Sequence, residues 1–444
     1  MPGALTHDPI RVGGGMYRNS DGSAPALLSV LGNRANTIYT AGDSLSANQF
    51  GISGSTYLAI NTEGAFTWVD ACLGGAFNLL GNTAVGGKTC RQMIDEQFPE
   101  IIAEAPRYCF FTAGTNDLYL GDADASTTYD RIIEAVEKLL AAGITPIWST
   151  IWGRDYSASY TRLALQVNER LRRYAYTQQA GLFWDGFIPT HDPTGATGGG
   201  RAPLASYFYD ASIHPNNLLG MRAGQFCAAA IGSRIYQPNR FVVGSETATT
   251  GYNGSNLLLN PNFAGTSGTV SANCTGTMPT SWVIDWATRT GSGSAAAAIV
   301  NITDSPTGLA VGQAVQVTIS GTPANGDIVR VYQSNTENAA LLSNLTTGNV
   351  FNCEGQIGVA SGAAVRELRF RGQTNTESTW WGVNDKTAVD YPASVPLMSG
   401  QSQNLTVLGA GAPANARYDF RVTFSGNSSG TVLTFARPRF RKVS

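Results

Sequence analysis

Between residues 36 and 236, short apolar runs alternate with stretches in which apolar residues recur every three to four positions. The runs are apolar on both faces, which is typical of strands buried in a parallel sheet, and the periodic stretches predict helices that cover it. The predicted strands are 36–42, 77–85, 107–114, 145–151 and 181–185. The predicted helices are 66–74, 88–105, 127–143, 160–179 and 216–235. This order predicts an α/β domain whose sheet is mainly parallel.

After about residue 240 the helical period stops, and apolar and polar residues alternate in short segments separated by Gly, Asn, Ser and Pro. Strict alternation of this kind predicts an all-β sandwich. We therefore expect an N-terminal arm or cap at 1–35, the α/β domain at 36–238, a linker at 239–255 and the sandwich at 256–444.

Polar residues and glycines follow three of the predicted strands. Ser44 lies in AGDSLS after the first strand, and Gly86 and Gly87 lie in NTAVGGKT after the second. Asn116 lies in TAGTNDL after the third. Parallel strands end at the same edge of a sheet, so these residues are expected to converge there. Each alone fits a turn, but together they offer a hydroxyl nucleophile and donors for an oxyanion.

A serine nucleophile needs a base, and the chain has three histidines: His7, His191 and His214. His214 directly precedes a predicted helix at the same sheet edge, which makes it the candidate. The nearest upstream carboxylate, Asp210, lies four positions earlier. Three interpretations are open: a local bulge that lets Asp210 orient the ring, a dyad oriented by a backbone carbonyl, or an acid from elsewhere, for which Asp192 is the candidate.

Composition narrows the classes of function. A net charge of −2 gives no electrostatic reason to expect nucleic acid or a membrane as partner, and no apolar run reaches the length of a membrane span. The start of the chain has no signal-peptide pattern, whereas the Gly-, Thr-, Ser- and Asn-rich texture is typical of extracellular proteins. The cysteines show no metal-ligand spacing, and Cys274 with Cys353 form a candidate disulfide.

Taken together, the four blocks resemble the SGNH, or GDSL-type, hydrolase superfamily over residues 36–236. GDSL carries Ser44, NTAVGGKT is the glycine block, GTND carries Asn116 and HPN carries His214. The resemblance implies a flavodoxin-like three-layer fold with Ser44 and His214 as catalytic residues. It implies an oxyanion hole made by the N–H groups of Ser44 and Gly87 and the Asn116 amide. It also implies acyl transfer from an ester to water without a metal or organic cofactor.

The chain departs from the family pattern at two places. Ala84 stands where the glycine block usually has another Gly, and Ala211 stands where the family has its acid, three positions before the histidine. We favour the bulge with Asp210 as the acid, because the neighbouring sequence is otherwise in register. Trp68 matches an aromatic found near the site in members that act on acetylated sugars. Asp43 and Trp68 are the predicted substrate contacts.

The β-rich part resembles jelly-roll carbohydrate-binding modules at NLLLNPNFAG, MPTSW and FARPRF. Trp282, Trp286, Trp380 and Trp381 lie in this part, and each can either stack on a sugar ring or fill the core. A sugar-binding sandwich beside an esterase suggests that the substrate is an acetylated polysaccharide. Such pairs without a signal peptide also occur in phage tail proteins, so the protein is expected to be extracellular or virion-associated. If it is a phage tail protein, a trimer is expected, and the N-terminal arm is a remnant of, or a join to, a tail-attachment region.

Two other functions stay open at the level of the sequence. The first is a general short-chain esterase or lipase, against which the polar segment PTGATGGGRAP before His214 argues. The second is a receptor-binding phage tail protein with little or no activity, which the displaced Asp210 favours. Turnover separates enzyme from binding protein, and release of acetate from a polysaccharide separates the two kinds of esterase.

Overall fold

A computed structural model describes most of the chain after residue 35. The described residues are 36–47, 50–53, 57–154, 158–191, 205–210, 213–236, 255–303, 310–362, 364–375, 377–384, 390–408 and 414–442. The predicted arm at 1–35 and nearly all of the predicted linker at 239–255 therefore lie outside the described residues. Asn36–Ser444 form one compact unit.

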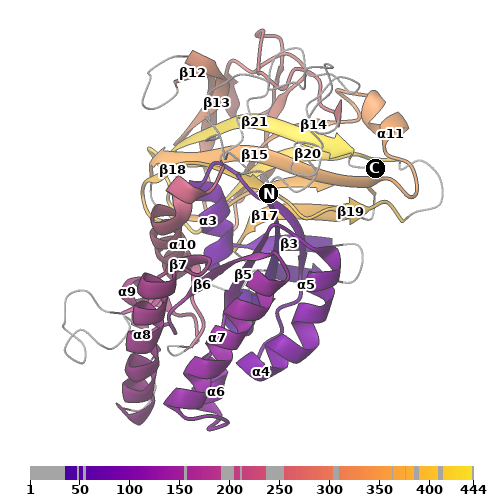
Figure 1. Cartoon of the computed structure of the whole chain (residues 1–444). Coiled ribbons are helices and arrows are strands. Elements are labelled where there is room, and N and C mark those ends of the chain that lie inside the picture. Colours follow the sequence, from indigo (N-terminus) through magenta and orange to yellow (C-terminus); the bar gives the residue numbers. More distant parts are fainter. Residues whose placement is uncertain are drawn as a thin grey trace. The chain divides into compact units, whose positions relative to one another are not determined.

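Five parallel strands form the sheet of the α/β part, in the order β4-β1-β5-β6-β7 (Figure 1). Their bounds are β1 (Thr37–Gly42), β4 (Asn78–Asn82), β5 (Tyr108–Thr112), β6 (Thr145–Ser149) and β7 (Leu182–Trp184). Because β1 lies between β4 and β5, the order of the strands reverses at β1. In doubly wound sheets, ligands bind beyond the carboxyl ends of the strands at this point of reversal.

Helices cover both faces of this sheet. One face packs against α5 (Phe98–Glu104), α7 (Ala125–Ala141) and α8 (Ala158–Gln178) in one hydrophobic cluster. The other face packs against α3 (Ala65–Cys72) and α10 (Asn217–Ile231). The shorter helices are α2 (Ser44–Ala47), α4 (Cys90–Gln92), α6 (Thr115–Tyr119) and α9 (Phe187–Thr190), with a π-helical turn at Met93–Gln97. The predicted α/β class is confirmed.

Side-chain caps fix where two of the long helices begin. The Asp124 carboxylate accepts a hydrogen bond from the Thr127 N–H at 2.7 Å and starts α7. The Asn216 side chain accepts from the N–H groups of Leu218 and Leu219 and starts α10. Both are short polar residues that satisfy N–H groups left free by the first helical turn. The second cap matters for the site because Asn216 follows His214 closely.

The β-rich part contains two large sheets. The first has the order β10-β12-β13-β21-β15-β18, with β8 on β21 and β19 on β15. Its strands are β8 (Ser255–Asn256), β10 (Cys274–Gly276), β12 (Ser294–Thr303), β13 (Ala310–Ser320), β15 (Val350–Ser361), β18 (Val395–Gln401), β19 (Leu405–Thr406) and β21 (Val432–Lys442). A short helix, α11 (Ala340–Asn344), lies between β14 and β15 in the sequence.

The second sheet has the order β2-β3-β17-β16-β20-β14-β11-β9. Its strands are β2 (Phe50–Ser53), β3 (Tyr57–Asn61), β9 (Thr269–Val270), β11 (Val283–Thr288), β14 (Ile328–Ser334), β16 (Val365–Gln373), β17 (Ser378–Val383) and β20 (Arg417–Phe424). Most neighbours in both sheets are antiparallel. The predicted β-rich region is therefore confirmed, and its likeness to a jelly roll stays a prediction.

Two strands of the second sheet come from the α/β part of the sequence. β2 and β3 follow the turn at Ser44 as an antiparallel pair, and β3 pairs in parallel with β17. The segment at residues 50–61 was not predicted as strand, because it is short and lacks a regular apolar pattern. The predicted boundary near residue 238 therefore separates the two parts in the sequence but not in space.

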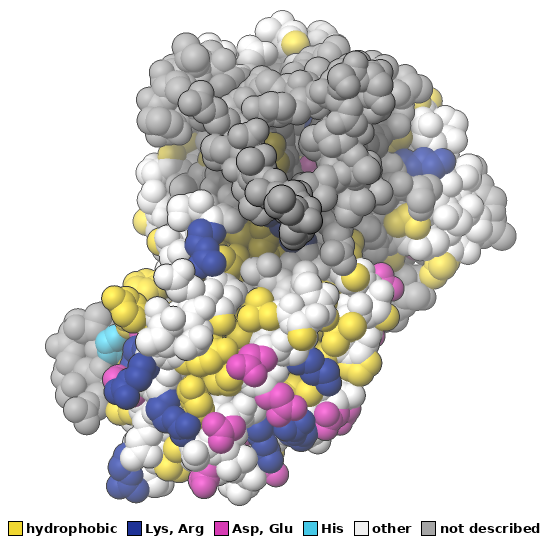
Figure 2. Space-filling model, viewed as in Figure 1, with side chains coloured by type: hydrophobic (Ala, Val, Ile, Leu, Met, Phe, Trp, Pro, Cys, Tyr) yellow, Lys and Arg dark blue, Asp and Glu magenta, His cyan; other side chains and the backbone are white. Residues whose placement is uncertain are grey.

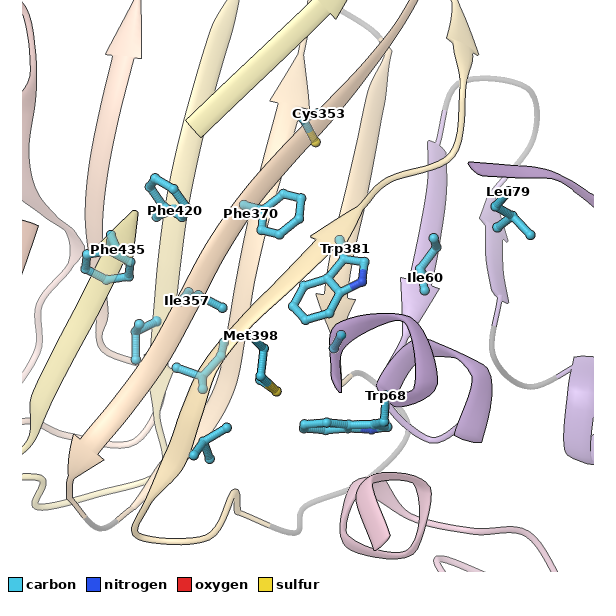
Figure 3. Packing of buried hydrophobic residues seen from close by; sticks show 14 of the residues in the cluster. Ile60, Trp68, Leu79, Cys353, Ile357, Phe370, Trp381, Met398, Phe420 and Phe435 are labelled. Carbon is cyan, nitrogen blue, oxygen red and sulfur yellow. The ribbon is translucent and has the colours of Figure 1, made fainter. Parts of the chain in front are cut away.

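The two parts also share a hydrophobic core. Ile60 of β3 and Trp68 of α3 belong to the same buried cluster as Trp381 and Met398 of the β-rich part (Figure 3). The Trp68 ring lies 5.8 Å from the ring of Tyr391. Since burial of apolar surface is the main driving force of folding, each part contributes to the stability of the other.

Two expectations about the β-rich part need correction. Trp282 and Trp381 are core residues with no surface for a sugar, since both are fully buried. Cys274 and Cys353 are free thiols. They lie on β10 and β15, and β12, β13 and β21 separate those strands in the sheet. This separation is too large for a disulfide, whose Cα atoms lie within about 7 Å of each other.

Charges of both signs are interspersed over the helices of the α/β part (Figure 2). Lys88 pairs with Glu96, and Arg91 pairs with Glu134. This mixture agrees with the small net charge of the sequence. Among the helices in the described ranges, none is both long and apolar enough to cross a membrane.

Candidate functional site

A tight turn after β1 positions Ser44. Gly42 has a φ of +124°, and a Cβ at this position would lie 2.5 Å from the carbonyl oxygen of Thr112. Only glycine fits such a conformation and such a close approach. The Gln97 side chain holds the turn, because it accepts from the Gly42 N–H at 2.8 Å and donates to the Gly42 carbonyl at 2.9 Å. The chain then places Ser44, half-buried, as the first residue of α2.

The Asp43 side chain is buried in the protein and has almost no surface that a substrate could contact. It is 2% exposed and accepts hydrogen bonds from the Leu45 N–H at 2.9 Å and the Thr112 hydroxyl at 3.3 Å. Burial raises the pKa of Asp43, while the positive charge of Arg154 and the hydrogen bonds from the Leu45 N–H and the Thr112 hydroxyl act in the opposite direction. The predicted substrate contact at Asp43 is thus a buried cap of the nucleophile turn. Asp43 also interacts electrostatically with His214, so the two residues lie within electrostatic range of each other.

The glycine block lies beside Ser44. The Thr83 N–H donates to the Thr40 carbonyl at 2.9 Å, and the Val85 N–H donates to the Gly42 carbonyl at 3.1 Å, so the loop continues along the end of β1. A Cβ at Gly86 would lie 3.7 Å from the Ser44 Cβ. Gly87 has a φ of +81° with open space around its Cα. This left-handed conformation favours glycine at position 87 and explains the second glycine of the block.

Asn116 joins the same edge from β5. It is the second residue of α6 and is 7% exposed. Its Nδ2 donates to the carbonyl oxygen of Lys88 at 3.0 Å, which ties α6 to the end of the glycine loop. An amide nitrogen carries two hydrogens, so one N–H of Asn116 is available for another acceptor. The next residue, Asp117, is fully buried and pairs with Arg131, which fixes the start of α6.

His214 lies on a small hairpin that explains its spacing from Asp210. Phe208 and Pro215 form a β-bridge, and the Tyr209 N–H donates to the His214 carbonyl at 3.1 Å. Asp210 stands at the turn of this hairpin. One of its carboxylate oxygens accepts from the His214 N–H at 2.6 Å, and the other hydrogen-bonds to Nδ1 of the His214 ring. The structure thus brings together the two residues that the bulge interpretation pairs, while Asp192 lies outside the described residues.

Two residues that the sequence reasoning did not single out surround His214. The Tyr209 ring stacks on the imidazole with centroids 5.7 Å apart and planes 18° apart. Burial and the nearby carboxylates of Asp210 and Glu63 raise the pKa of Tyr209 to about 12, so its phenol stays neutral. Stacking limits rotation of the imidazole, which helps to keep its ring nitrogens in one orientation.

Arg154 is the second such residue. It follows β6, it is 5% exposed, and its Nε donates to the carbonyl oxygen of Ile213 at 3.3 Å. Its charge also acts on buried Asp43. Arg154 therefore connects the histidine hairpin with the nucleophile turn. Its place in WGRD after the fourth predicted strand was the signal that could have identified it.

The remaining candidates lie elsewhere. Trp68, the second predicted substrate contact, is 1% exposed, and its Nε1 donates to the Thr62 carbonyl at 2.7 Å inside the shared core. The His191 ring stacks on Phe187 in α9, and His7 lies outside the described residues. Within the described ranges no group of three or more His, Cys, Asp and Glu side chains is arranged to hold a metal ion.

Comparisons with known proteins find similarity for the α/β part. Residues 40–219 match the model of the GDSL-like lipase/acylhydrolase family. This part of the chain is a GDSL, or SGNH, hydrolase domain, and its family is one of carboxylic ester hydrolases. The match does not extend into the β-rich part. No curated protein matches the chain.

Solved structures are similar to the same part of the chain. A GDSL-family lipolytic protein from Veillonella parvula is 21% identical and covers 45% of this chain and 98% of its own, with a TM-score of 0.33. The esterase EstA from Pseudoalteromonas sp. is 17% identical, with coverages of 45% and 98% and a TM-score of 0.33. An acetylxylan esterase from Geobacillus stearothermophilus is 14% identical, with coverages of 44% and 94% and a TM-score of 0.36. These TM-scores are too low to support any statement about substrate.

Proposed function

We propose that this protein is a serine esterase that removes acetyl groups from an O-acetylated polysaccharide. The observation that carries the proposal is the Asp210 carboxylate on the His214 ring, with Asp43 of the nucleophile turn within electrostatic range of that ring. A serine, a histidine and a carboxylate in this relation are the groups that acyl transfer through an acyl-enzyme requires. The proposed partner is an acetylated glycan outside the cell or on its surface, and the reaction requires no cofactor.

The proposed reaction has two halves. In the first, the Ser44 oxygen attacks the ester carbonyl while His214 takes its proton, and the sugar alcohol then leaves with that proton. In the second, His214 takes a proton from water, whose oxygen attacks the acetyl-enzyme, and acetate leaves as Ser44 regains its proton. The N–H groups of Ser44 and Gly87 and the free N–H of Asn116 stabilise the oxyanion of both steps. Donors of this kind contribute about 10²- to 10³-fold each to the rate.

The β-rich part supports a carbohydrate over a lipid as substrate. Its first and last strands resemble those of carbohydrate-binding modules, and the segment before His214 is polar. A receptor-binding role without turnover is less well supported, because its one argument was the displaced Asp210, and Asp210 contacts His214. We also propose that the protein assembles into trimers on a phage tail.

Acyl-chain selectivity tests the proposed substrate class. We expect kcat/KM for p-nitrophenyl acetate to exceed that for p-nitrophenyl octanoate by about 10-fold or more, since a site shaped for acetyl rejects additional methylenes. We also expect release of acetate from an O-acetylated polysaccharide, measured by coupled assay. Faster turnover of the octanoate would favour the lipidic esterase, and no turnover of any ester would favour the binding protein.

Exchange of Asp210 for asparagine tests its role. Asparagine keeps an acceptor for the His214 N–H but loses the charge that stabilises the imidazolium, so kcat is expected to fall by up to about 10⁴-fold with KM little changed. Asp130→Asn is the matched control, because this carboxylate is 66% exposed on α7. A fall of less than 10-fold in a variant with the melting temperature of the wild type would indicate a dyad or an acid such as Asp192.

A further inference from the structure

The second sheet carries a row of arginines on the face that points away from the core. In the register of the strands, Arg421 lies opposite Arg330 on one side and Arg369 on the other. Two further arginines lie on the same face. Arg371 lies two residues from Arg369 along β16, and Arg417 lies four residues from Arg421 along β20. The rings of Trp380 and Tyr332 lie beneath these guanidiniums at 4.3 to 5.8 Å.

Among the residues that the structure describes, carboxylates pair with three of these arginines. Arg330 pairs with Asp285, Arg371 pairs with Asp419 and Arg369 pairs with Glu367. The other two, Arg417 and Arg421, pair with no carboxylate in the part of the chain that the structure describes, and their Nε atoms, like that of Arg369, are buried without a hydrogen-bond acceptor there. A buried donor without an acceptor costs free energy, and the cost is larger for a charged group. Because Arg417 and Arg421 also lack a paired carboxylate among the described residues, an external anion that contacts their Nη atoms would stabilise these two cations most.

The electrostatics of the row point in the same direction. Burial and the positive charges of Arg330 and Arg371 lower the pKa of Arg417, against the opposite effect of Asp419. Burial and neighbouring arginines lower the pKa of Arg421 to about 10, against the opposite effect of Asp419. Positive charge on this face thus exceeds what its carboxylates compensate.

A polar pocket of about 220 Å³ lies at one end of the row. Arg417 lines it together with Asn335, Gln373, Asn375 and Asn415, and the side-chain oxygens of Asn375 and Asn335 accept from the N–H groups of Asn415 and Ala416. Its volume is below that of pockets that hold drug-sized molecules and suits a single sugar ring. Amide groups both donate and accept hydrogen bonds, as sugar hydroxyls do.

We propose that this pocket binds a carboxylate-bearing sugar unit of an acidic polysaccharide, with the Arg417 guanidinium on the carboxylate. The guanidinium matches a carboxylate with two parallel N–H donors. Arg421 lies four residues further along β20, about 13 Å away at the rise of an extended strand, and extends the positive surface toward a neighbouring acidic unit. That the same polymer is the substrate of the esterase rests on the proposed function, whereas binding at this pocket does not.

Calorimetric titration of the full chain with unacetylated trigalacturonate tests the proposal without turnover. Its carboxyl-reduced, neutral counterpart and sodium sulfate at equal ionic strength serve as comparison ligands. We expect trigalacturonate to bind at least about 10-fold more tightly than either, because charge-assisted hydrogen bonds and sugar contacts act together only in this ligand. Equal binding of the neutral trimer, equal binding of sulfate, or no binding of trigalacturonate would each overturn the proposal.

Arg417→Gln locates the interaction. This exchange is expected to weaken binding of trigalacturonate about 10- to 100-fold, the effect of losing hydrogen bonds to a charged group. Arg173→Gln is the matched control, since Arg173 is 77% exposed on α8, outside the pocket. Unchanged affinity of Arg417→Gln, with its melting temperature equal to that of the control, would overturn the assignment to this pocket. Loss of ester hydrolysis alone would contradict the proposed function and leave this result unaffected.

Discussion

Exchange of Ser44 for alanine is expected to lower kcat for p-nitrophenyl acetate by about 10⁶-fold, as in other serine hydrolases that lose their nucleophile. Ser44 is half-buried at the first position of α2, and the turn before it is fixed by Gly42 and Gln97 rather than by the serine side chain. The variant should therefore fold as the wild type does, and the loss can be assigned to chemistry.

Ser46→Ala is the control within the same short helix. The Ser46 hydroxyl hydrogen-bonds to the Thr112 hydroxyl at 2.9 Å and is buried, so its loss should lower the free energy of unfolding by about 1 kcal/mol while kcat changes little. Mass spectrometry after rapid acid quench should detect an acetyl group on the wild type and Ser46→Ala, but not on Ser44→Ala. Wild-type turnover by Ser44→Ala would contradict the proposed mechanism outright.

The sequence predicted those parts of the site that depend on strand ends. Ser44, Gly87 and Asn116 each follow a strand of the parallel sheet, and the topology alone brings such positions to one edge. Asp210 was also identified, although its spacing to His214 is unusual, because a carboxylate near a histidine can be found by inspection. The hairpin that explains the spacing depends on a bridge between Phe208 and Pro215, which no periodicity indicates.

The sequence could not predict what depends on packing between distant segments. Arg154, for example, reaches the histidine hairpin from the end of β6 through one hydrogen bond to a backbone carbonyl. Trp68 was assigned to the substrate because of its neighbours in the sequence, but contact with Tyr391 places it in the core. An aromatic residue on a helix fits the same sequence pattern whether it contacts a substrate or packs in the core. Only its contacts in the structure distinguish the two roles.

The pairing of β3 with β17 also depends on contact between segments that are distant in the sequence. It leads to the second large effect that we expect. A chain that ends at residue 236, and so lacks the β-rich part, should not fold into an active esterase. β3 would lose its parallel partner, and the buried side chains of Ile60, Trp68 and Val69 would lose the partners that they have in the shared cluster. Removal of a single buried tryptophan side chain costs about 3–5 kcal/mol, against a total stability of about 5–15 kcal/mol for a typical domain.

Two measurements check this expectation. The shortened chain should be insoluble or lack native circular dichroism, and urea should unfold the full chain in one transition followed equally by activity and by fluorescence. Trp68→Ala in the full chain should shift that single transition to lower urea, whereas Trp286→Ala, which removes a half-buried ring of β11, should shift it less. A soluble, active chain ending at residue 236, or two separate transitions, would show that the parts fold independently. The hydrolase domain would then need the β-rich part for binding alone. The nucleophile turn, which leads directly into β2 and β3, would keep its geometry even though β3 has lost its partner β17.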